Sequence, residues 1–320
     1  MNSDTLVKIA FPGLGIETFT VDKVAFSLFG LEVRWYGILI TCGIILAYLY
    51  ACWRGKQEGI GDEDILDLAM FAVIFGIIGA RAYYVLMKPE EFDSFLEVIN
   101  IPGGGLAIYG GIIAGCLTLI IGSKIKKINL LRLLDCAGPG VMVAQALGRW
   151  GNFFNGEAYG AETEIFCRMG LQHYNWMSMH YYHPTFLYES LWNLLGFALI
   201  NLVYRKKKFD GQIVLMYFGW YGFGRMFIEG LRTDSLYLGQ FRVSQLVAGI
   251  SFVACTALLI AGFCHAHRRK LAGGDYTAVY AKVTETAADV QKQEEERPAK
   301  ESSENQATET KENQTNGKAD

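Results

Sequence analysis

The sequence predicts an all-α, polytopic membrane protein with about seven transmembrane helices. Of its 320 residues, 52% are apolar and only 19% are charged. The apolar residues form runs close to the length of about 20 residues that a membrane-spanning helix needs. Most of these runs lack the polar face that a helix of a soluble protein presents to water. The predicted spans are residues 33–53, 66–88, 106–123, 130–148, 185–204, 211–230 and 242–263.

Individual residues weaken the prediction of the fourth span and argue against two kinds of ligand site in the third and seventh. The fourth is the weakest, because Asp135 and Pro139 interrupt it. The third follows a glycine-rich stretch, 101–111, which has neither the lysine of a P-loop nor the preceding strand of a dinucleotide site and so argues against nucleotide binding. Its glycines instead predict close packing between helices. The seventh span contains no lysine, which argues against a retinal protein, because retinal needs a Schiff-base lysine.

Basic residues predict the orientation of the helices. Thirteen Lys and Arg residues lie on one side of the predicted spans, at 54–65, 124–132, 205–210 and 264–270. Only five lie in the alternate segments, at 1–32, 89–105, 149–183 and 231–241. Because basic loops remain on the cytoplasmic side, we expect the N-terminus outside, the C-terminus in the cytoplasm and 149–183 at the outer face.

Composition divides the chain into two parts. Residues 1–264 form the predicted transmembrane domain, and residues 265–320 form a polar cytoplasmic tail rich in Lys, Glu, Gln, Thr and Asn. We expect this tail to be disordered, because it has too few large apolar side chains to offset its ordering entropy. The seven cysteines are scattered without metal-ligand spacing, so the sequence predicts neither a zinc site nor a disulfide framework.

Ionisable side chains inside the predicted spans indicate a functional site. Such a group costs about 2.5–3.5 kcal/mol near the bilayer centre, so it usually faces the protein interior and has a role. In the sixth span, Tyr221, Arg225 and Glu229 are spaced to lie on one helix face, and Arg232 continues close to that face. A purely structural ion pair between Arg225 and Glu229 is the alternative. Other charges in or at the ends of spans are Arg34, Arg81, Asp135, Arg149 and Glu189.

The stretch at 147–160, LGRWGNFFNGEAYG, places polar side chains and four glycines directly after an apolar run. Arg149 lies at the end of the fourth predicted span and Asn152 three residues on, and the glycines permit tight turns or close approach to a ligand. An ordinary loop is the alternative, since glycine and asparagine are common in loops. A guanidinium group suits phosphate, because it donates two parallel hydrogen bonds and stays charged.

Together these patterns indicate an anionic ligand reached from the outer half of the membrane, as expected of a phospholipid-handling protein. A transporter or flippase for an anionic lipid or solute is the rival class. Many transporter folds contain repeated halves, and we find no repeated half-motifs in this sequence.

Several motifs resemble those of one family. The run GRWGNFFNGE at 148–157, followed by Gly160, is similar to the signature G-R-x-G-N-F-x-N-G-E-x-x-G of prolipoprotein diacylglyceryl transferases. Further similar motifs, in the family's order, are RWYG at 34–37, YGG at 109–111, His183-Pro184 with LYE at 187–189, and YGF-x-R-x-x-x-E at 221–229. The resemblance covers about residues 20–263 and leaves the tail outside.

This resemblance implies a multi-pass enzyme of the bacterial cell membrane. Members of the family transfer the diacylglyceryl group of phosphatidylglycerol to the thiol of the lipobox cysteine in a preprolipoprotein signal peptide. The products are a thioether-linked lipid and glycerol 1-phosphate, and the reaction is the first step of lipoprotein maturation. The resemblance implies no metal ion, no organic cofactor and no nucleic-acid partner.

The resemblance also implies roles for single residues. Arg149 and Arg225 match the two arginines on which the family depends most, so both are expected to bind the phosphate of phosphatidylglycerol and to stabilise the leaving group. Other matched residues are expected to shape the phosphatidylglycerol site, namely Tyr36, Asn152, Gly160, Tyr221 and Glu229. Supporting roles are expected for Glu157, Arg232, His183 and Glu189.

Tyr109 is a departure from the family pattern, because many members have histidine there, in a His-Gly-Gly motif. That histidine is a candidate general base, which makes Tyr109 a candidate catalytic residue. A tyrosine hydroxyl, with an ordinary pKa of about 10, is a poor base at neutral pH unless a neighbouring arginine lowers its pKa. Either Tyr109 acts as a phenolate beside an arginine, or the family's histidine is mainly a positioning donor. We favour the second interpretation.

Overall fold

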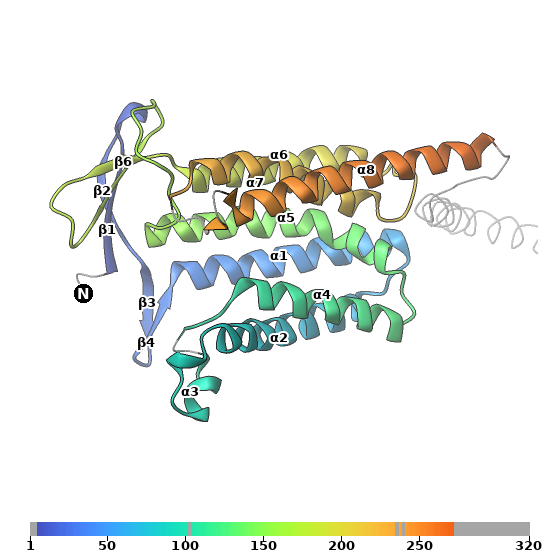
Figure 1. The fold of residues 1–320 in the computed structure, drawn as a ribbon, viewed down its shortest axis with the longest axis horizontal. Helices are drawn as coiled ribbons and strands as arrows, with labels where there is room; N and C mark the ends of the chain where they lie inside the picture. The colour runs from blue at the N-terminus through green and yellow to red at the C-terminus, as the bar shows by residue number, and fades with distance from the viewer. Residues whose placement is uncertain (1–4, 102–103, 234–236, 239–240, 272–320) are drawn as a thin grey trace, which may run out of the picture.

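The computed structural model describes residues 5–101, 104–233, 237–238 and 241–271. Within this part of the chain, seven long helices run side by side, and a small β-sheet covers one end of them (Figure 1). The long helices are α1 (Trp35–Glu58), α2 (Asp62–Met87), α4 (Ile108–Ile125), α5 (Leu130–Asn155), α6 (Thr185–Tyr204), α7 (Gln212–Leu231) and α8 (Val243–Leu271). A short helix, α3 (Phe95–Ile99), lies between α2 and α4. α8 extends into the first part of the predicted tail, and residues 272–320 of that tail lie outside the described residues.

Six of the described helices are long and apolar enough to cross a membrane, namely α1, α2, α4, α5, α6 and α8. α5 qualifies although the sequence made it the weakest expected span. α7 is 20 residues long but is not among the six. It carries Gln212, Arg225 and Glu229 and packs against α5, α6 and α8, so neighbouring helices surround much of it. A mostly helical membrane architecture is thus confirmed with six candidate spans, and the seventh span stays a prediction.

The prediction of an all-α protein is wrong outside the long helices, where strands form. A four-stranded antiparallel sheet has the order β2-β1-β5-β6. Its strands are β1 (Leu6–Phe11), β2 (Ile16–Asp22), β5 (Met169–His173) and β6 (His180–Tyr182). Two hairpins add β3 (Val24–Leu28) with β4 (Leu31–Arg34), and β7 (Tyr237–Leu238) with β8 (Phe241–Arg242).

The sheet lies directly over the end of α5. In β1, Val7 and Ile9 are fully buried, whereas Lys8 between them is exposed, which is the period-two pattern of a half-buried strand. Ile9 pairs with Leu171 of β5, and both side chains belong to an apolar cluster that includes Phe153 of α5. A search for apolar runs of about 20 residues does not detect so short a pattern, so the sequence analysis missed the sheet.

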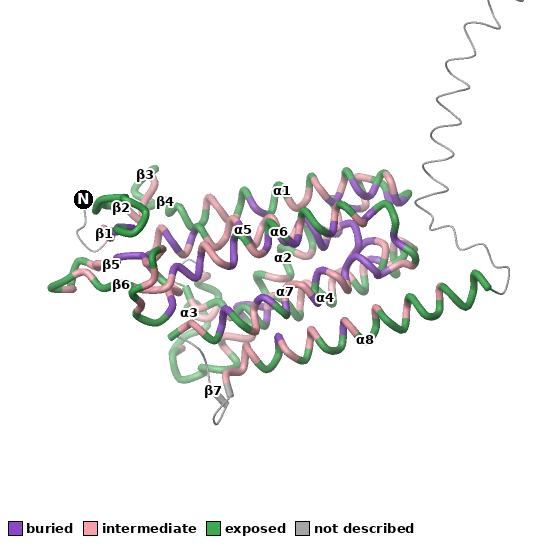
Figure 2. Tube along the Cα trace, turned by 90° about the horizontal axis from the view of Figure 1, so that it is seen from above, coloured by how far each residue is buried: buried purple, intermediate pink, exposed green. Residues whose placement is uncertain are grey.

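α5 is the central helix and extends further than the sequence predicted. It packs against α1, α6 and α7, and its buried face contrasts with the largely exposed α8 in Figure 2. The helix continues to Asn155 instead of ending near residue 148, and Gly156 terminates it in the left-handed region at φ 64°. Arg149 and Asn152 are therefore helical residues three positions apart, which places them on neighbouring points of one helix surface.

α2 and α4 approach each other closely through glycines. A Cβ atom on Gly110 would clash with the carbonyl oxygen of Gly79, so the two backbones meet where neither residue has a side chain. This contact confirms the packing role predicted for the glycines that begin the third span. Arg81 of α2, a charge singled out in the sequence, donates four hydrogen bonds to carbonyl oxygens of residues 97–105. It therefore holds the connection between the two helices.

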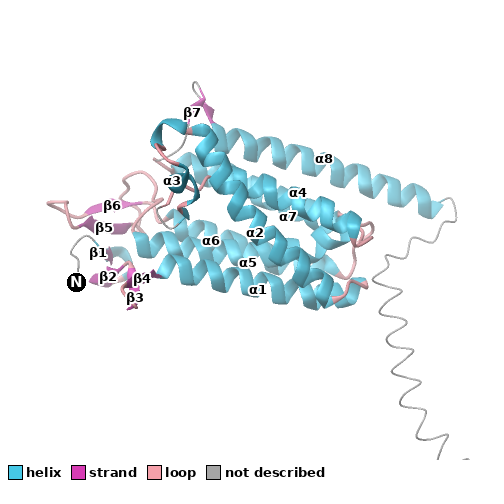
Figure 3. Ribbon diagram, turned by 90° about the horizontal axis from the view of Figure 1, so that it is seen from below, coloured by secondary structure: helices cyan, strands magenta, loops and turns pink. Residues whose placement is uncertain are grey.

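The loops that join α1 to α2, α4 to α5 and α6 to α7 lie at the end of the helices opposite the sheet (Figures 1 and 3). A buried ionic cluster closes this end. Lys207 Nζ lies 2.5 Å from Glu58 Oε1 and 3.3 Å from Asp135 Oδ2, and none of the three side chains is exposed. Asp135 also accepts hydrogen bonds of 2.9 Å from the N–H groups of Gly211 and Val214. It therefore satisfies backbone donors at the start of α7.

Candidate active site

Glu189, in the second turn of α6, is the centre of an ionic cluster at the sheet end of the helices. Its side chain is only 3% exposed. Its Oε2 atom lies 2.7 Å from Arg149 Nη2 of α5. Its Oε1 atom accepts a hydrogen bond of 2.5 Å from Arg225 Nη1 of α7. Three helices therefore meet at one buried carboxylate.

Glu229 provides a second buried carboxylate on α7. Its Oε2 atom lies 2.5 Å from Arg225 Nη2 and 4.0 Å from Arg232 Nε. Arg232 Nη1 also lies 3.9 Å from Glu189 Oε1. Arg225 thus bridges the two glutamates. The shared helix face that the sequence predicted for Arg225 and Glu229 is confirmed by their direct ion pair.

The arginine cluster consists of Arg149, Arg225 and Arg232 with Glu189 and Glu229. Among the described residues, its three guanidinium groups lie within 4.0 Å of its two carboxylates. The glutamate side chains are 2–3% exposed, whereas the arginine side chains are 12–21% exposed. A buried carboxylate is costly without a positively charged partner. The two glutamates therefore hold the guanidinium groups in place beside them. The partly exposed guanidinium groups can bind an anion such as a phosphodiester through paired hydrogen bonds.

A chain of hydrogen bonds leads from Arg149 toward the sheet. Arg149 Nη1 donates to Asn152 Oδ1 at 3.4 Å, and Asn152 Nδ2 donates to Glu157 Oε1 at 3.0 Å. On the neighbouring helix, Tyr36 packs against Gly151 of α5, where an added Cβ would lie 2.6 Å from the tyrosine ring. Glycine at 151 therefore lets the ring of Tyr36 lie against the turn of α5 that carries Arg149 and Asn152.

Gly160 joins the loop after α5 to the end of α7. Its N–H donates to the carbonyl of His183 at 3.0 Å, and it forms an isolated β-bridge with Arg232. The next N–H, of Ala161, donates to the carbonyl of Leu231 at 2.7 Å. The backbone at Gly160 thus fixes Arg232 relative to the segment that enters α6.

His183 contacts the site through its backbone. Its ring Nδ1 lies 3.4 Å from the hydroxyl of Tyr188, which lies 3.6 Å from Cys167 Sγ. Partial burial lowers the pKa of His183, so its imidazole is neutral at pH 7. The residue therefore supports the cluster as the hydrogen-bond partner of Gly160, and its ring adds no charge.

Tyr109 and Tyr221, both predicted for the site, have no hydrogen bond or ion pair with Arg149 or Arg225 in the described part of the chain. Tyr109, in the first turn of α4, is 40% exposed, and its helix packs mainly against α2. In the described part of the chain, the hydrogen bonds and ion pairs of Arg149 and Arg225 do not include Tyr109. Tyr221 lies one turn before Arg225 on α7, and its ring centroid is 6.3 Å from that of Tyr217.

Two contacts at the site were missed in the sequence. Arg242, the residue before α8, donates a hydrogen bond to the carbonyl oxygen of Glu229 and so ties α8 to the cluster. Its charge at the start of the seventh predicted span is the signal that could have identified it. Thr185 Oγ1 donates at 2.5 Å to the carbonyl of Ala158, a contact between distant segments that no spacing indicates. Among the described residues, no three His, Cys, Asp or Glu side chains are placed to hold a metal ion.

The structure brings most of the predicted residues to one place, and comparisons with known proteins match the same part of the chain. The family model of prolipoprotein diacylglyceryl transferase matches residues 23–261. That range contains every predicted site residue and leaves out the C-terminal tail.

Similar proteins from several bacteria bear the name phosphatidylglycerol–prolipoprotein diacylglyceryl transferase. The protein from Finegoldia magna is 48% identical over 244 residues, which cover 76% of this chain and 93% of that protein. The protein from Clostridioides difficile is 45% identical over 235 residues, covering 73% and 92%. The protein from Listeria welshimeri is 44% identical over 247 residues, covering 75% and 89%. The chain therefore belongs to the prolipoprotein diacylglyceryl transferase family.

Proposed function

We propose that this protein transfers the diacylglyceryl group of phosphatidylglycerol to the thiol of the lipobox cysteine of preprolipoproteins. The products are a thioether and glycerol 1-phosphate, and the step is the first in lipoprotein maturation. The observation that carries the proposal is the arginine cluster, in which two buried glutamates hold three partly exposed guanidinium groups. Family membership supports the choice of substrates, since the relatives are named for phosphatidylglycerol and prolipoprotein.

The reaction places its charge change at the phosphate. The cysteine thiol releases its proton to solvent, and the sulfur attacks the terminal glyceryl carbon of the diacylglycerol, so that a C–S bond forms and the C–O bond to phosphate breaks. The electron pair of that bond goes to the phosphate oxygen, so the departing monoester gains negative charge. Arg149 and Arg225 stabilise this charge more in the transition state than in the ground state, which is what accelerates the step. Arg232 is held by the same glutamates and supports them.

The proposed membrane topology has seven spans, with the sheet outside and the C-terminus in the cytoplasm of a bacterial cell. Basic loops support it, because residues 54–65, 124–132 and 205–210 lie at the end of the helices opposite the sheet. α7 has 20 residues, and a helix of that length is about 30 Å long, the thickness of the hydrocarbon core. In this orientation the arginine cluster lies toward the outer leaflet.

A transfer assay tests the proposed function against the transporter alternative. Purified protein is incubated with phosphatidylglycerol and a peptide that contains a lipobox cysteine, and the peptide is weighed by mass spectrometry. We expect a gain of one diacylglyceryl group and release of glycerol 1-phosphate. Movement of lipid across vesicle membranes without covalent change of the peptide would instead establish a transporter.

Tyr109→Phe is expected to retain turnover within about tenfold of the wild type. The reason is the position of Tyr109 on α4, where the described residues include no hydrogen bond or ion pair between it and Arg149 or Arg225. The measurement is the rate of peptide lipidation at saturating phosphatidylglycerol. A loss of about 10³-fold with unchanged folding would assign the phenol oxygen to the chemical step.

Gly160→Ala is expected to lower turnover at least tenfold. The added Cβ would lie 2.7 Å from His183 Cβ and 3.0 Å from the carbonyl oxygen of Leu231, so the backbone that positions Arg232 must move. Overpacking of this kind typically costs about 1–3 kcal/mol. Gly37→Ala is the matched control, because no atom lies within 4 Å of its added Cβ. Equal rates for the two variants would show that the close packing at Gly160 does not position the site.

A further inference from the structure

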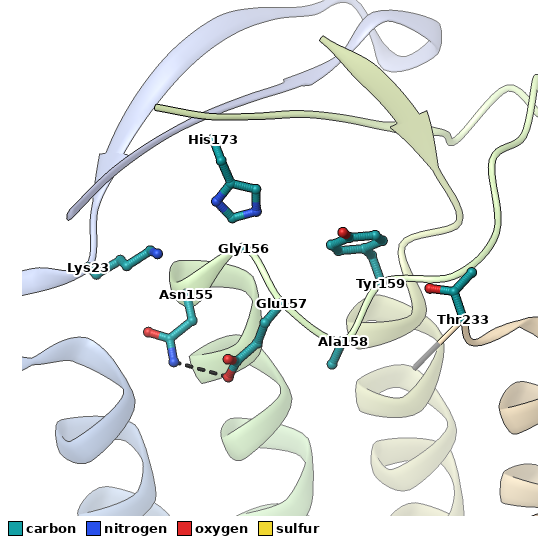
Figure 4. A pocket seen from close by; sticks show the side chains of 8 residues that line it. All are labelled: Lys23, Asn155, Gly156, Glu157, Ala158, Tyr159, His173 and Thr233. Atoms are coloured by element: carbon teal, nitrogen blue, oxygen red, sulfur yellow. Dashed lines mark hydrogen bonds between the residues drawn. The ribbon is translucent and has the colours of Figure 1, made fainter. Parts of the chain in front are cut away.

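A polar cavity of about 380 Å³ lies between the sheet and the end of α5 (Figure 4). Its side chains come from the end of α5, the following loop, β5, the connection between β2 and β3, and the residue after Arg232. They are Lys23, Asn155, Glu157, Tyr159, His173 and Thr233. Only Glu157 belongs to the residues that the proposed transfer uses, so the cavity is unexplained by that reaction.

The cavity offers a positive charge on one wall and hydrogen-bond acceptors on another. The amine of Lys23 projects into it, and the ring of His173 points down from the sheet (Figure 4). Burial, with the nearby charge of Lys23, lowers the pKa of His173, so the imidazole is neutral at pH 7. On the α5 side, Glu157 Oε1 accepts a hydrogen bond of 3.0 Å from Asn155 Nδ2, and Thr233 adds a hydroxyl.

The wall of the cavity is fixed by a strained residue. Ala158 lies in the left-handed region at φ 57°, a conformation that costs a non-glycine residue about 1–2 kcal/mol. Its carbonyl accepts the 2.5 Å hydrogen bond from Thr185, whose own exposure is 1%. Such strain persists only where the surroundings enforce it, and it concentrates at functional sites.

The cavity adjoins the arginine cluster in two places. Glu157 is linked to Arg149 through Asn152 by hydrogen bonds of 3.0 and 3.4 Å. Thr233 directly follows Arg232, which pairs with both buried glutamates. The polar end of a lipid whose phosphate sits on the arginine cluster can therefore extend into the cavity.

We propose that this cavity binds the glycerol of the phosphatidylglycerol headgroup while the phosphate lies on the arginine cluster, and then binds the free glycerol 1-phosphate. Lys23 pairs with phosphate oxygens as the product moves outward, and Glu157 and Thr233 hydrogen-bond the glycerol hydroxyls. A volume of 380 Å³ corresponds to about a dozen water molecules at about 30 Å³ each. This volume lies at the small end of the range of about 300–1,000 Å³ for ligand pockets, and the polar lining suits a small polar molecule. This inference rests on the proposed transfer reaction.

Product inhibition tests the inference. Full-length protein in mixed micelles is assayed for peptide lipidation with increasing sn-glycerol 1-phosphate. Lys23→Met is expected to raise the inhibition constant about tenfold, as expected for the loss of one charge-assisted hydrogen bond. Lys23→Arg keeps the charge and is expected to stay within about threefold of the wild type. Lys8→Met removes the same charge from the exposed face of β1 and is expected to leave the inhibition constant unchanged.

The Michaelis constant for phosphatidylglycerol shows whether the cavity binds the lipid headgroup as well as free glycerol 1-phosphate. If Lys23→Met raises both constants, the cavity holds the lipid headgroup as well as the product; if it raises the inhibition constant alone, the cavity holds the free product. Equal inhibition of Lys23→Met and Lys8→Met would overturn the inference. So would a wild-type protein that lipidates the peptide but is not inhibited by glycerol 1-phosphate. A wild-type protein that does not lipidate the peptide would instead refute the transfer reaction itself.

Discussion

Arg149→Ala is expected to lower the rate of diacylglyceryl transfer by about 10³-fold, the loss typical when one donor that stabilises a developing negative charge is removed. The protein should still fold, because Glu189 keeps its 2.5 Å hydrogen bond from Arg225. Arg225→Ala is expected to reduce transfer as strongly and stability more, since it removes one ion-pair partner from each of Glu189 and Glu229. Lipidation of the peptide and thermal unfolding in detergent measure the two effects.

Lysine variants separate geometry from charge. Arg149→Lys and Arg225→Lys keep the positive charge beside the buried glutamates but lose the paired donors that fit phosphate. We expect near-normal stability and a loss of transfer of about 10²-fold. Arg168→Ala is the matched control, because Arg168 hydrogen-bonds only to the carbonyls of Glu164 and Ile165 among the described residues. Full activity in either Arg→Ala variant would rule out the role of that arginine in leaving-group stabilisation.

Lys207→Met is expected to give the largest loss of stability, about 3–5 kcal/mol, because it leaves buried carboxylates without their cation. The Lys207 side chain has no exposure and lies 2.5 Å from Glu58 and 3.3 Å from Asp135. Burial acts to lower the pKa of Lys207, but the two carboxylates outweigh it, so its pKa is raised and the ammonium stays charged at neutral pH. We expect the unfolding midpoint in detergent to fall by about 10 °C.

Neighbouring lysines provide the control for this prediction. Lys206→Met and Lys208→Met remove the same charge from exposed positions in the same loop and should change the midpoint by no more than about 2 °C. In the double variant Glu58→Gln with Lys207→Met, part of the lost stability should return, because one unpaired carboxylate is gone. A Lys207→Met midpoint equal to that of Lys208→Met would contradict the idea that this cluster closes the end of the helices.

Local patterns in the sequence predicted the helices and part of the site well. Apolar runs of membrane length correspond to the long helices, because burial in lipid imposes that composition along a continuous segment. The pairing of Arg225 with Glu229 follows from helical spacing alone. Arg149 and Asn152 of the family signature at 148–157 lie on a helix that runs to Asn155, and their roles in the site stay a prediction.

Contacts between distant segments could not be predicted in this way. Glu189 was expected only to support the site, yet it joins Arg149 and Arg225 from two other helices. No periodicity relates residues about 40 positions apart, so its central place required the structure. For Arg81 and Asp135, in contrast, the sequence indicated a functional role and the structure shows a structural one. Their charges suggested function, whereas their hydrogen bonds to backbone groups show that they hold loops and helix ends.

The strands of the sheet also could not be predicted from local patterns in the sequence. β1 and β5 are each short, and their pairing joins residues 7–10 with residues 170–173. Each strand alone buries too little apolar surface to be distinguished from a loop, and the burial depends on the pairing and on the end of α5. Sequence patterns alone therefore place both segments in outer loops and give no sign of the cavity that they help to form.

The most direct test of the arginine cluster is the single-turnover rate of peptide lipidation by Arg149→Ala at saturating phosphatidylglycerol. If the guanidinium group stabilises the leaving phosphate in the transition state, the rate stays about 10³-fold below that of the wild type however much lipid is added. Recovery of the wild-type rate at high lipid concentration would contradict this account, because it would show that Arg149 only helps to bind the lipid.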